Sequence, residues 1–301
     1  MTARTPAAVV LALLALAACT PSTPRSAGPP ESPAPTSQSP APTTSAPTAT
    51  PSPTASVIHP GGTMRVAAYY LGGTTSRPVL YREFRTVPRS AGVIRSAVDT
   101  MLHAAPADAD YRSLWPRATT VRGISVNGAT ATVDLSANAR SVTASAAAER
   151  ASLQQLVHTV TAAAPSVTGV RLRFDGATRS TLWGHVATTG TLTRGPAAET
   201  LGAVWVVTPA QGTRVGRTFT VTGTASVFEA TVSWSVTRAG STTALASGSV
   251  NASTGAPGRG DWTVRVTLPA GTTGVVVFTG WEASAEDGSV TSPDTKAFRV
   301  V

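Results

Sequence analysis

Few side chains in this sequence have the type and spacing that catalysis or metal binding requires. Histidine, a common general base and metal ligand, occurs four times in 301 residues, at His59, His103, His158 and His185. None of the four lies at metal-ligand spacing from a second histidine or from a cluster of acids. The sequence also has no HExxH, GxSxG or SxxK motif and no glycine-rich phosphate loop. We therefore expect no catalytic residue, no metal and no cofactor, and we predict structural or surface roles for the histidines.

Asp134 is the residue for which a catalytic role is the main alternative to this expectation. It lies near the end of a predicted strand, where its carboxyl group could serve as the acid of a cell-wall hydrolase. The alternative is that Asp134 hydrogen-bonds a turn or caps the segment that follows. Asp175 stands in an Asp-Gly pair, and the same reasoning makes it a turn residue.

Three further groupings of charged residues have a functional and a structural interpretation. Glu229 and Glu282 each follow a large aromatic residue, and acids beside aromatics inside a strand could pair with an arginine across the sheet, which is a structural interpretation. Glu286-Asp287-Gly288 could hold calcium, but two acids in one loop are a poor ligand set for that ion. Arg259-Gly260-Asp261 matches an integrin-binding tripeptide, which we interpret as a chance match in an arginine-rich chain.

Cys19 is the only cysteine of the chain and follows a secretory signal. Arg4 precedes an apolar run from Ala7 to Ala18, which is too short to span a hydrocarbon core of about 30 Å. The run ends in Leu16-Ala17-Ala18-Cys19, which resembles the lipobox of bacterial lipoproteins. That resemblance implies that residues 1–18 are removed, that Cys19 receives a diacylglyceryl group and palmitate, and that the protein is lipid-anchored at the extracytoplasmic face of the cell membrane. The alternative is an ordinary signal peptide with an incidental cysteine.

A single cysteine also limits how the folded part is stabilised. No disulfide can form within the chain, and a metal site built from cysteine thiolates is excluded. Residues 19–62 are predicted to be a disordered linker, because 12 of the 23 prolines lie there and aromatic residues are absent. The folded part must therefore depend on packed cores beyond this linker.

Positive charge is concentrated in the first half of the remaining chain. The formal net charge is +9, and residues 64–185 contain fourteen arginines against seven acids. Residues 200–301 contain seven basic and six acidic residues, among them Lys296, the only lysine. A basic domain outside the cell could contact anionic lipid, a wall polymer or an acidic protein face. Nucleic acid is not an expected partner, since no basic run is interleaved with stacking aromatics.

Residues 63–190 show the alternation of strands and helices that an α+β domain requires. Strands are predicted at 65–71, 79–87, 121–127, 129–135 and 167–174, with a type I′ turn at Asn127-Gly128. Amphipathic helices are predicted from residue 93 to about 102 and from about 143 to 164. The order ββαββαβ predicts one mixed sheet carrying two helices.

The segments VLYREFR, GISVNGATATVDLS and QQLVHTVTAAAPSVTGVRLRFDG resemble the GerMN domain of sporulation and spore-germination proteins. This resemblance implies an extracytoplasmic interaction module without an established active site.

Residues 200–301 lack helical periodicity and contain seven short alternating strands, as in an immunoglobulin-like all-β sandwich. Trp234 and Trp262 each alternate with valines and are expected in its core. The segments VVTPAQGTRVGRTFTVTGTASVFEATVSWSV, GDWTVRVTLP and WEASAEDGSV resemble the immunoglobulin-like domain of bacterial spore germination.

The sequence therefore predicts an anchored, non-enzymatic binding or scaffold protein of the cell envelope. Its expected partners are the membrane, through the lipid, and an envelope protein or wall polymer, through the two folded modules. The competing hypothesis is an envelope hydrolase that uses Asp134, and a passive spacer is the third.

Overall fold

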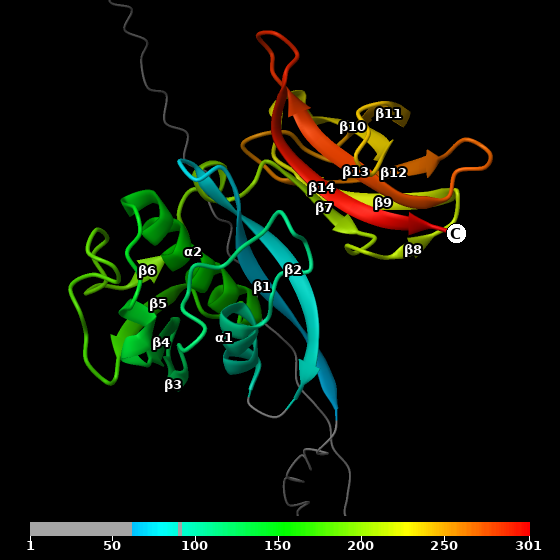
Figure 1. Cartoon of the computed structure of the whole chain (residues 1–301). Helices are drawn as coiled ribbons and strands as arrows, with labels where there is room; N and C mark the ends of the chain where they lie inside the picture. The colour runs from blue at the N-terminus through cyan, green and yellow to red at the C-terminus, as the bar shows by residue number, and fades with distance from the viewer. Residues whose placement is uncertain (1–61, 90–91) are drawn as a thin grey trace, which may run out of the picture. The chain divides into compact units, whose positions relative to one another are not determined.

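The computed structural model of the protein describes residues 62–89 and 92–301 (Figure 1). The predicted signal peptide, Cys19, His59 and the linker as far as residue 61 lie outside these residues. Within them, the elements follow the predicted order of an α+β domain and a β-rich second half, so the expected fold class is confirmed. No helix of the described part combines the length and apolar character that a membrane crossing requires.

The first two strands form a sheet of their own. β1 (Thr63–Gly73) pairs with β2 (Pro78–Pro88) in an antiparallel hairpin. At the outer edge of β1, the N–H and C=O of Leu71 bond to Arg112, and at the edge of β2 the C=O of Leu80 accepts the N–H of Gly202. The prediction of one mixed sheet is therefore wrong in this respect, because the hairpin edges pair with loop segments and not with the other strands.

The second sheet has the order β3-β4-β5-β6. β3 (Val121–Asn127) and β4 (Thr130–Leu135) are antiparallel, β4 and β5 (Gly169–Phe174) are parallel, and β6 (Leu192–Thr193) is a short edge strand. The β3–β4 turn differs from the predicted one. Asn127 is paired with Thr130, so Gly128 and Ala129 are the two central residues. Only Gly128 has a positive φ, of 55°, which fits a type II′ turn better than a type I′ turn.

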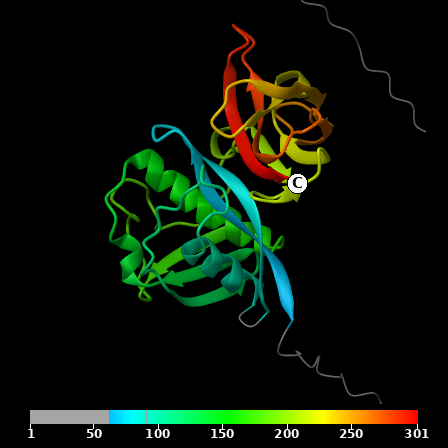
Figure 2. The ribbon, with the colours of Figure 1, turned by 45° about the vertical axis from the view of Figure 1, so that its right-hand side comes forward.

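Two helices lie between the hairpin and the second sheet (Figure 2). α1 (Val93–His103) and α2 (Ala146–Ala163) each contact strands of both sheets. α2 begins after Ser145, whose hydroxyl oxygen accepts the N–H of Ala148 and so satisfies one of the free donors of the first turn. The apolar faces of both helices, the hairpin and the second sheet enclose one core, with fully buried residues such as Met101, Leu156, Tyr70, Leu135 and Phe174.

A short connection leads from the first domain to the second. It contains α3 (Ala197–Thr200), a single turn that was not expected from the sequence. β7 (Val204–Thr208) follows, and its Trp205 belongs to the core of the first domain. The Trp205 indole N–H donates to the backbone C=O of Leu80 over 3.1 Å. The first strand of the second domain is therefore packed against the hairpin of the first.

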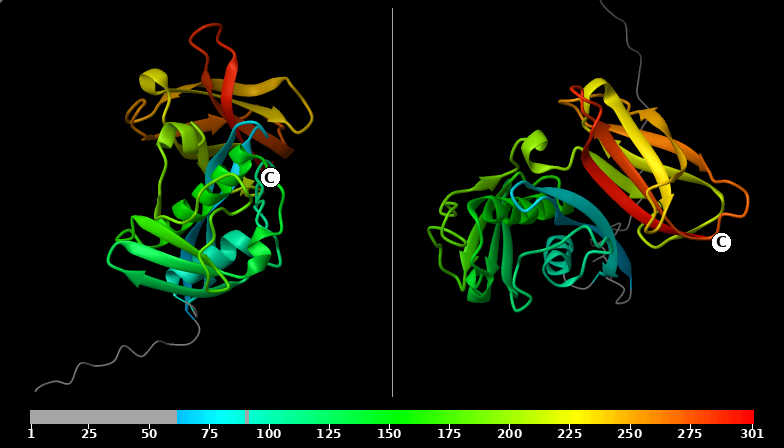
Figure 3. Two further views of the ribbon diagram at one scale, coloured as in Figure 1. Left: turned by 90° about the vertical axis from the view of Figure 1, so that its left-hand side faces the viewer. Right: turned by 45° about the horizontal axis from the view of Figure 1, so that its top comes forward.

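The second domain is a sandwich of two facing sheets (Figure 3). One sheet has the order β12-β9-β7 and the other the order β11-β10-β13-β14-β8. The strands are β8 (Arg214–Val215), β9 (Thr218–Ala225), β10 (Thr231–Arg238), β11 (Ala244–Asn251), β12 (Gly260–Thr267), β13 (Gly274–Ala283) and β14 (Val290–Val300). All seven predicted strands are present, and β8 is additional.

The predicted tryptophan core of the sandwich is confirmed. Trp234 and Trp262 are buried, and both rings stack on Phe278, with centroids 5.9 and 6.2 Å away. Gly223 makes room for this packing, since a Cβ there would lie 2.0 Å from the carbonyl oxygen of Trp205 and 2.2 Å from the ring of Trp262. These aromatic residues, and not a disulfide, join the two sheets.

Candidate binding site between the two domains

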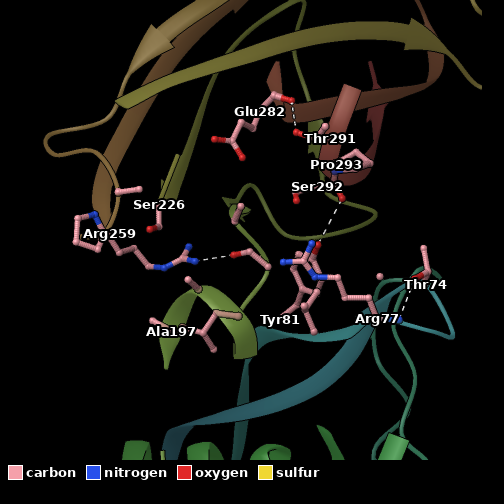
Figure 4. A pocket seen from close by; sticks show the side chains of 18 residues that line it. Thr74, Arg77, Tyr81, Ala197, Ser226, Arg259, Glu282, Thr291, Ser292 and Pro293 are labelled. Carbon is pink, nitrogen blue, oxygen red and sulfur yellow. Dashed lines mark hydrogen bonds between the residues drawn. The ribbon is translucent and has the colours of Figure 1, made fainter. Parts of the chain in front are cut away.

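A cavity of about 910 Å³ lies where the hairpin, the connection and the sandwich meet (Figure 4). Its lining residues come from both domains: Gly73, Thr74, Arg77, Val79, Tyr81, Ala197, Ala198, Leu201, Gly202, Ala203, Ser226, Ala256, Pro257, Arg259, Glu282, Thr291, Ser292 and Pro293. Small and apolar residues form most of the wall, and a few hydroxyls, one carboxyl and two guanidinium groups are placed among them. This combination is typical of sites that bind a ligand or peptide segment.

The tip of the β1–β2 hairpin supplies the first wall. Thr74 and Arg77 belong to the loop, and the Thr74 hydroxyl accepts the backbone N–H of Arg77 over 3.0 Å. Gly73 has a φ of 70°, and a Cβ there would lie 2.9 Å from the Arg77 carbonyl oxygen, so glycine is required for this tight loop. The loop leaves the Arg77 side chain exposed at the cavity.

The sandwich supplies the opposite wall through an irregular pair of strands. The β13–β14 register shifts between Gly280 and Glu282, and Ser292 adopts a φ of 49°. The Glu282 carboxylate accepts the backbone N–H of Phe228 over 2.8 Å, and the Thr291 hydroxyl donates to the Glu282 backbone carbonyl over 2.7 Å. Glu282 is thus tied to the sandwich itself, and the predicted pairing with an arginine across the sheet is wrong.

Arg259 closes the cavity on a third side. Its guanidinium donates to the carbonyl oxygens of Gly202, over 2.6 Å, and Thr224, over 3.4 Å, and lies 4.5 Å from the ring centre of Trp205. Burial lowers the pKa of Arg259 to about 10. The side chain therefore fastens the connection to the sandwich.

A buried polar cluster next to the cavity joins the domains. Lys296 of β14 forms ion pairs with Asp108 of the first domain and, over 3.7 Å, with Asp294. The Tyr111 hydroxyl donates to Asp294 over 2.6 Å, and the other Asp294 oxygen accepts the N–H of Val206 over 2.6 Å. Burial raises the pKa of Asp294 to about 6, although Lys296 opposes the rise. Burial, followed by the Asp294 charge, also raises the pKa of Tyr111.

No local sequence pattern marks this cluster, because its members are far apart in the chain. The only signal in the sequence is that Lys296 is the sole lysine among 24 basic residues.

Glu149 of α2 is a second buried polar residue that the sequence does not mark. It is fully buried, and its carboxylate accepts the backbone N–H groups of Leu182, Trp183 and His185 over 2.8 to 3.1 Å. Both features are structural, since they satisfy buried polar groups.

The three described histidines lie in positions that fit the predicted structural or surface roles. His103 contacts the carbonyl oxygens of Asp99 and Thr119, and His185 contacts that of Ala144. His158 is only 3% exposed, and neither ring nitrogen has a hydrogen-bond partner among the described residues. Its ring lies 5.2 Å from that of Tyr69. Burial, and then the charge of Arg194, lowers the pKa of His158 to about 4.

The acidic candidates also lie in structural positions. Both Asp134 oxygens accept the N–H of Gly176 over 3.0 Å, which is the predicted turn interaction. Asp175 has a φ of 48° and accepts from Arg122 and from the N–H of Ala137, as expected for a turn residue. The prediction for Glu229 is wrong, because it is exposed in a short 3₁₀ segment (Phe228–Ala230) that precedes β10.

The calcium interpretation of Glu286-Asp287-Gly288 gains no support from the loop geometry. Asp287 is fully exposed and accepts the N–H of Ser289 over 3.0 Å, a bond that lowers its pKa. Within residues 62–89 and 92–301, no group of three or more histidine, cysteine, aspartate or glutamate side chains could hold a metal ion.

The fold defines a protein of two modules with a cavity between them. Residues 67–180 match the family described as sporulation and spore germination, and residues 203–289 match the immunoglobulin-like domain of bacterial spore germination. The two resemblances stated from the sequence are thereby confirmed. Neither family description names an enzymatic activity.

Several solved structures are similar to the chain. A predicted lipoprotein from Clostridium perfringens is 18% identical, with 44% of this chain and 88% of that chain covered and a TM-score of 0.33. The tandem GerMN domains of the sporulation protein GerM from Bacillus subtilis are 15% identical, with coverage of 50% and 51% and a TM-score of 0.38. The first GerMN domain of the same protein is 19% identical, with coverage of 44% and 98% and a TM-score of 0.37. No curated protein matches the chain.

Proposed function

We propose that this protein is a lipid-anchored, non-enzymatic binding or scaffold protein of the cell envelope, and that the cavity between its domains receives part of a partner. The observation that carries the proposal is the composition of the cavity wall, to which both modules contribute. The buried cluster around Lys296 and the indole of Trp205 hold the two sides of the cavity together. A partner that fits the cavity would therefore contact both modules at once.

The titratable groups of the cavity favour binding over catalysis. General acid–base chemistry needs a group within hydrogen-bond reach of a substrate and with a suitable protonation state. The only carboxyl group in the lining, Glu282, already accepts the N–H of Phe228, and Arg259 is occupied by backbone carbonyls. Burial also raises the pKa of Tyr81 further above its ordinary value of 10. No contact in the described residues favours a hydrolase centred on Asp134, which bonds to the N–H of Gly176.

The anchoring part of the proposal rests on Cys19 and the apolar run that precedes it. We expect Cys19→Ala to abolish processing or to release the protein from the membrane, because the thiol is the proposed point of acylation. Fractionation of cells that express the wild type or the variant measures this directly. An unchanged membrane fraction together with unchanged processing of Cys19→Ala would contradict lipid anchoring and would leave the cavity proposal to its own test.

The binding part can be tested with a variant that fills the cavity. Ala198 is exposed in α3 and lines the cavity, so Ala198→Trp places an indole in the space for the partner. Ala239 is exposed in a turn of the sandwich and is not a lining residue, so Ala239→Trp is the matched control. Both substitutions are made in the full chain with Cys19→Ala, which serves as bait for detergent-solubilised membrane proteins and for purified peptidoglycan.

We expect the protein with Cys19→Ala alone and the Ala239→Trp variant to retain the same partner to the same extent. The Ala198→Trp variant should no longer retain it. Near-ultraviolet circular dichroism of the three proteins checks that the fold is intact. Equal retention by all three proteins would place the binding surface elsewhere, and no retention of any partner would contradict the proposal.

A further inference from the structure

A second hollow of about 660 Å³ lies on the first domain and shares no lining residue with the cavity between the domains. It is formed by the end of α2, the segment that follows it, the edge strand β6 and one face of the hairpin. The lining residues are Tyr69, Arg82, Thr161, Ala162, Pro165, Val167, Thr168, Thr193 and Arg194. The set contains two arginines, three threonines, a tyrosine and no acid.

Neither arginine of this hollow is neutralised by an acid. The ion pairs within the described part of the chain involve Arg85, Arg95, Arg122 and Lys296, and not Arg82 or Arg194. A guanidinium group stays charged at any physiological pH. The two side chains therefore bring two positive charges to one hollow without a negative charge in its wall.

Arg82 is held in place by aromatic rings. Its guanidinium carbon lies 4.7 Å from the ring centre of Phe84 and 5.5 Å from that of Trp205. Its Nε is buried and has no hydrogen-bond partner among the residues described. Cation–π contacts fix a guanidinium group without using its N–H donors, so the fork of Arg82 remains available for an anion.

Arg194 is held by a single side-chain hydrogen bond. Its Nε donates over 2.7 Å to the hydroxyl oxygen of Thr161, and that hydroxyl in turn donates over 2.7 Å to the backbone carbonyl of Val157. No other hydrogen bond of the Arg194 guanidinium occurs within the described ranges. The terminal nitrogens are therefore unused, while Thr161 fixes the direction in which they lie.

We propose that this hollow binds the phosphate group of a phosphate ester, either as a phospholipid headgroup or as a free ester. Paired guanidinium forks match phosphate oxygens geometrically, and hydroxyl groups such as those of Thr168 and Thr193 can complete the contacts. The hollow is several times larger than a phosphate group, so it also has room for the glycerol or sugar to which the phosphate is attached.

The test uses the full chain with Cys19→Ala, so that the protein's own proposed lipid does not contribute. One arm titrates glycerol 3-phosphate and inorganic phosphate, and follows the arginine side-chain resonances by NMR. The other arm measures co-sedimentation with vesicles of phosphatidylglycerol and phosphatidylcholine, or of phosphatidylcholine alone. Arg82→Gln and Arg194→Gln remove the proposed ligands. Arg173→Gln is the control, because it removes the same charge from an exposed position on β5 that does not line the hollow.

We expect each hollow variant to weaken binding roughly ten-fold, as the loss of a charge-assisted hydrogen bond does, and the control to change it less than about two-fold. Binding in solution, but not to phosphatidylglycerol vesicles, identifies a free ester as the ligand. Tighter binding to those vesicles identifies a headgroup, and both results support the phosphate site. The proposal is overturned if neither probe binds, or if all three variants weaken binding equally. Arg194 is exposed, so Arg194→Gln keeps the test valid even if Arg82→Gln destabilises the hairpin.

Discussion

His158 gives the most quantitative prediction for the folded protein. Its ring is buried without a hydrogen-bond partner in the described structure, and its pKa falls to about 4 from an ordinary value of 6.5. Between these two values the unfolded chain takes up a proton that the folded protein does not. The contribution of His158 to the free energy of unfolding is therefore greatest above pH 6.5, and it falls as the pH decreases towards 4.

The expected size follows from the two pKa values. Between pH 8 and pH 5, His158 should lower the free energy of unfolding by about 2 kcal/mol. Asp294 acts in the opposite direction, because its pKa rises to about 6, so stability from that group is largest at low pH and is lost as the pH rises through 6. Its contribution over the same interval is a gain of about 1 kcal/mol. The two effects oppose each other in the wild type, so only a comparison with a variant isolates His158.

The measurement is urea unfolding at pH 8 and pH 5, followed by tryptophan fluorescence. His158→Leu and His158→Gln both remove the titrating ring but differ in polarity. Each should gain about 2 kcal/mol over the wild type on going from pH 8 to pH 5. If both variants keep the pH dependence of the wild type, the buried and uncharged state assigned to His158 is incorrect.

Three further substitutions test the structural assignments. Lys296→Met leaves two buried aspartates without their cation and should cost about 3–5 kcal/mol in urea unfolding, and a loss below about 1 kcal/mol would contradict a buried pair. Glu149→Ala removes the acceptor of three backbone N–H groups and should cost about 3 kcal/mol or more, so an unchanged melting temperature would argue against this contact. Gly223→Ala should abolish the near-ultraviolet circular dichroism of the sandwich, since a Cβ there has contacts as short as 2.0 Å, and a native spectrum would disprove that packing.

Local patterns in the sequence predict the elements well. The spacing of Val98, Met101 and Leu102 predicts α1, and the alternation around Trp234 and Trp262 predicts two core strands of the sandwich. Both kinds of element bury one face, and that face determines the periodicity of apolar residues. Turn chemistry, which is also local, correctly places Asp134 and Asp175 in turn interactions.

The features that depend on contacts between distant segments could not be predicted in this way. The hairpin forms a separate sheet because its edges bond to Arg112 and Gly202, and neither residue is marked by a local pattern. The cavity lies between segments more than 200 residues apart, such as those that contain Arg77 and Ser292. Glu282 illustrates the same limit, because its partner is the backbone N–H of Phe228, and a backbone group leaves no signal in the sequence.

The central claim is that the cavity between the two domains receives a partner, and cross-linking from inside the cavity in living cells tests it most directly. A photoreactive benzoylphenylalanine replaces Arg77, an exposed lining residue, or Val126, which is 50% exposed on β3 and is not a lining residue. We predict an adduct of one defined mass from position 77, which decreases when Ala198→Trp fills the cavity, and no such adduct from position 126. An absence of adducts from position 77, or the same adduct from both positions, would contradict the claim.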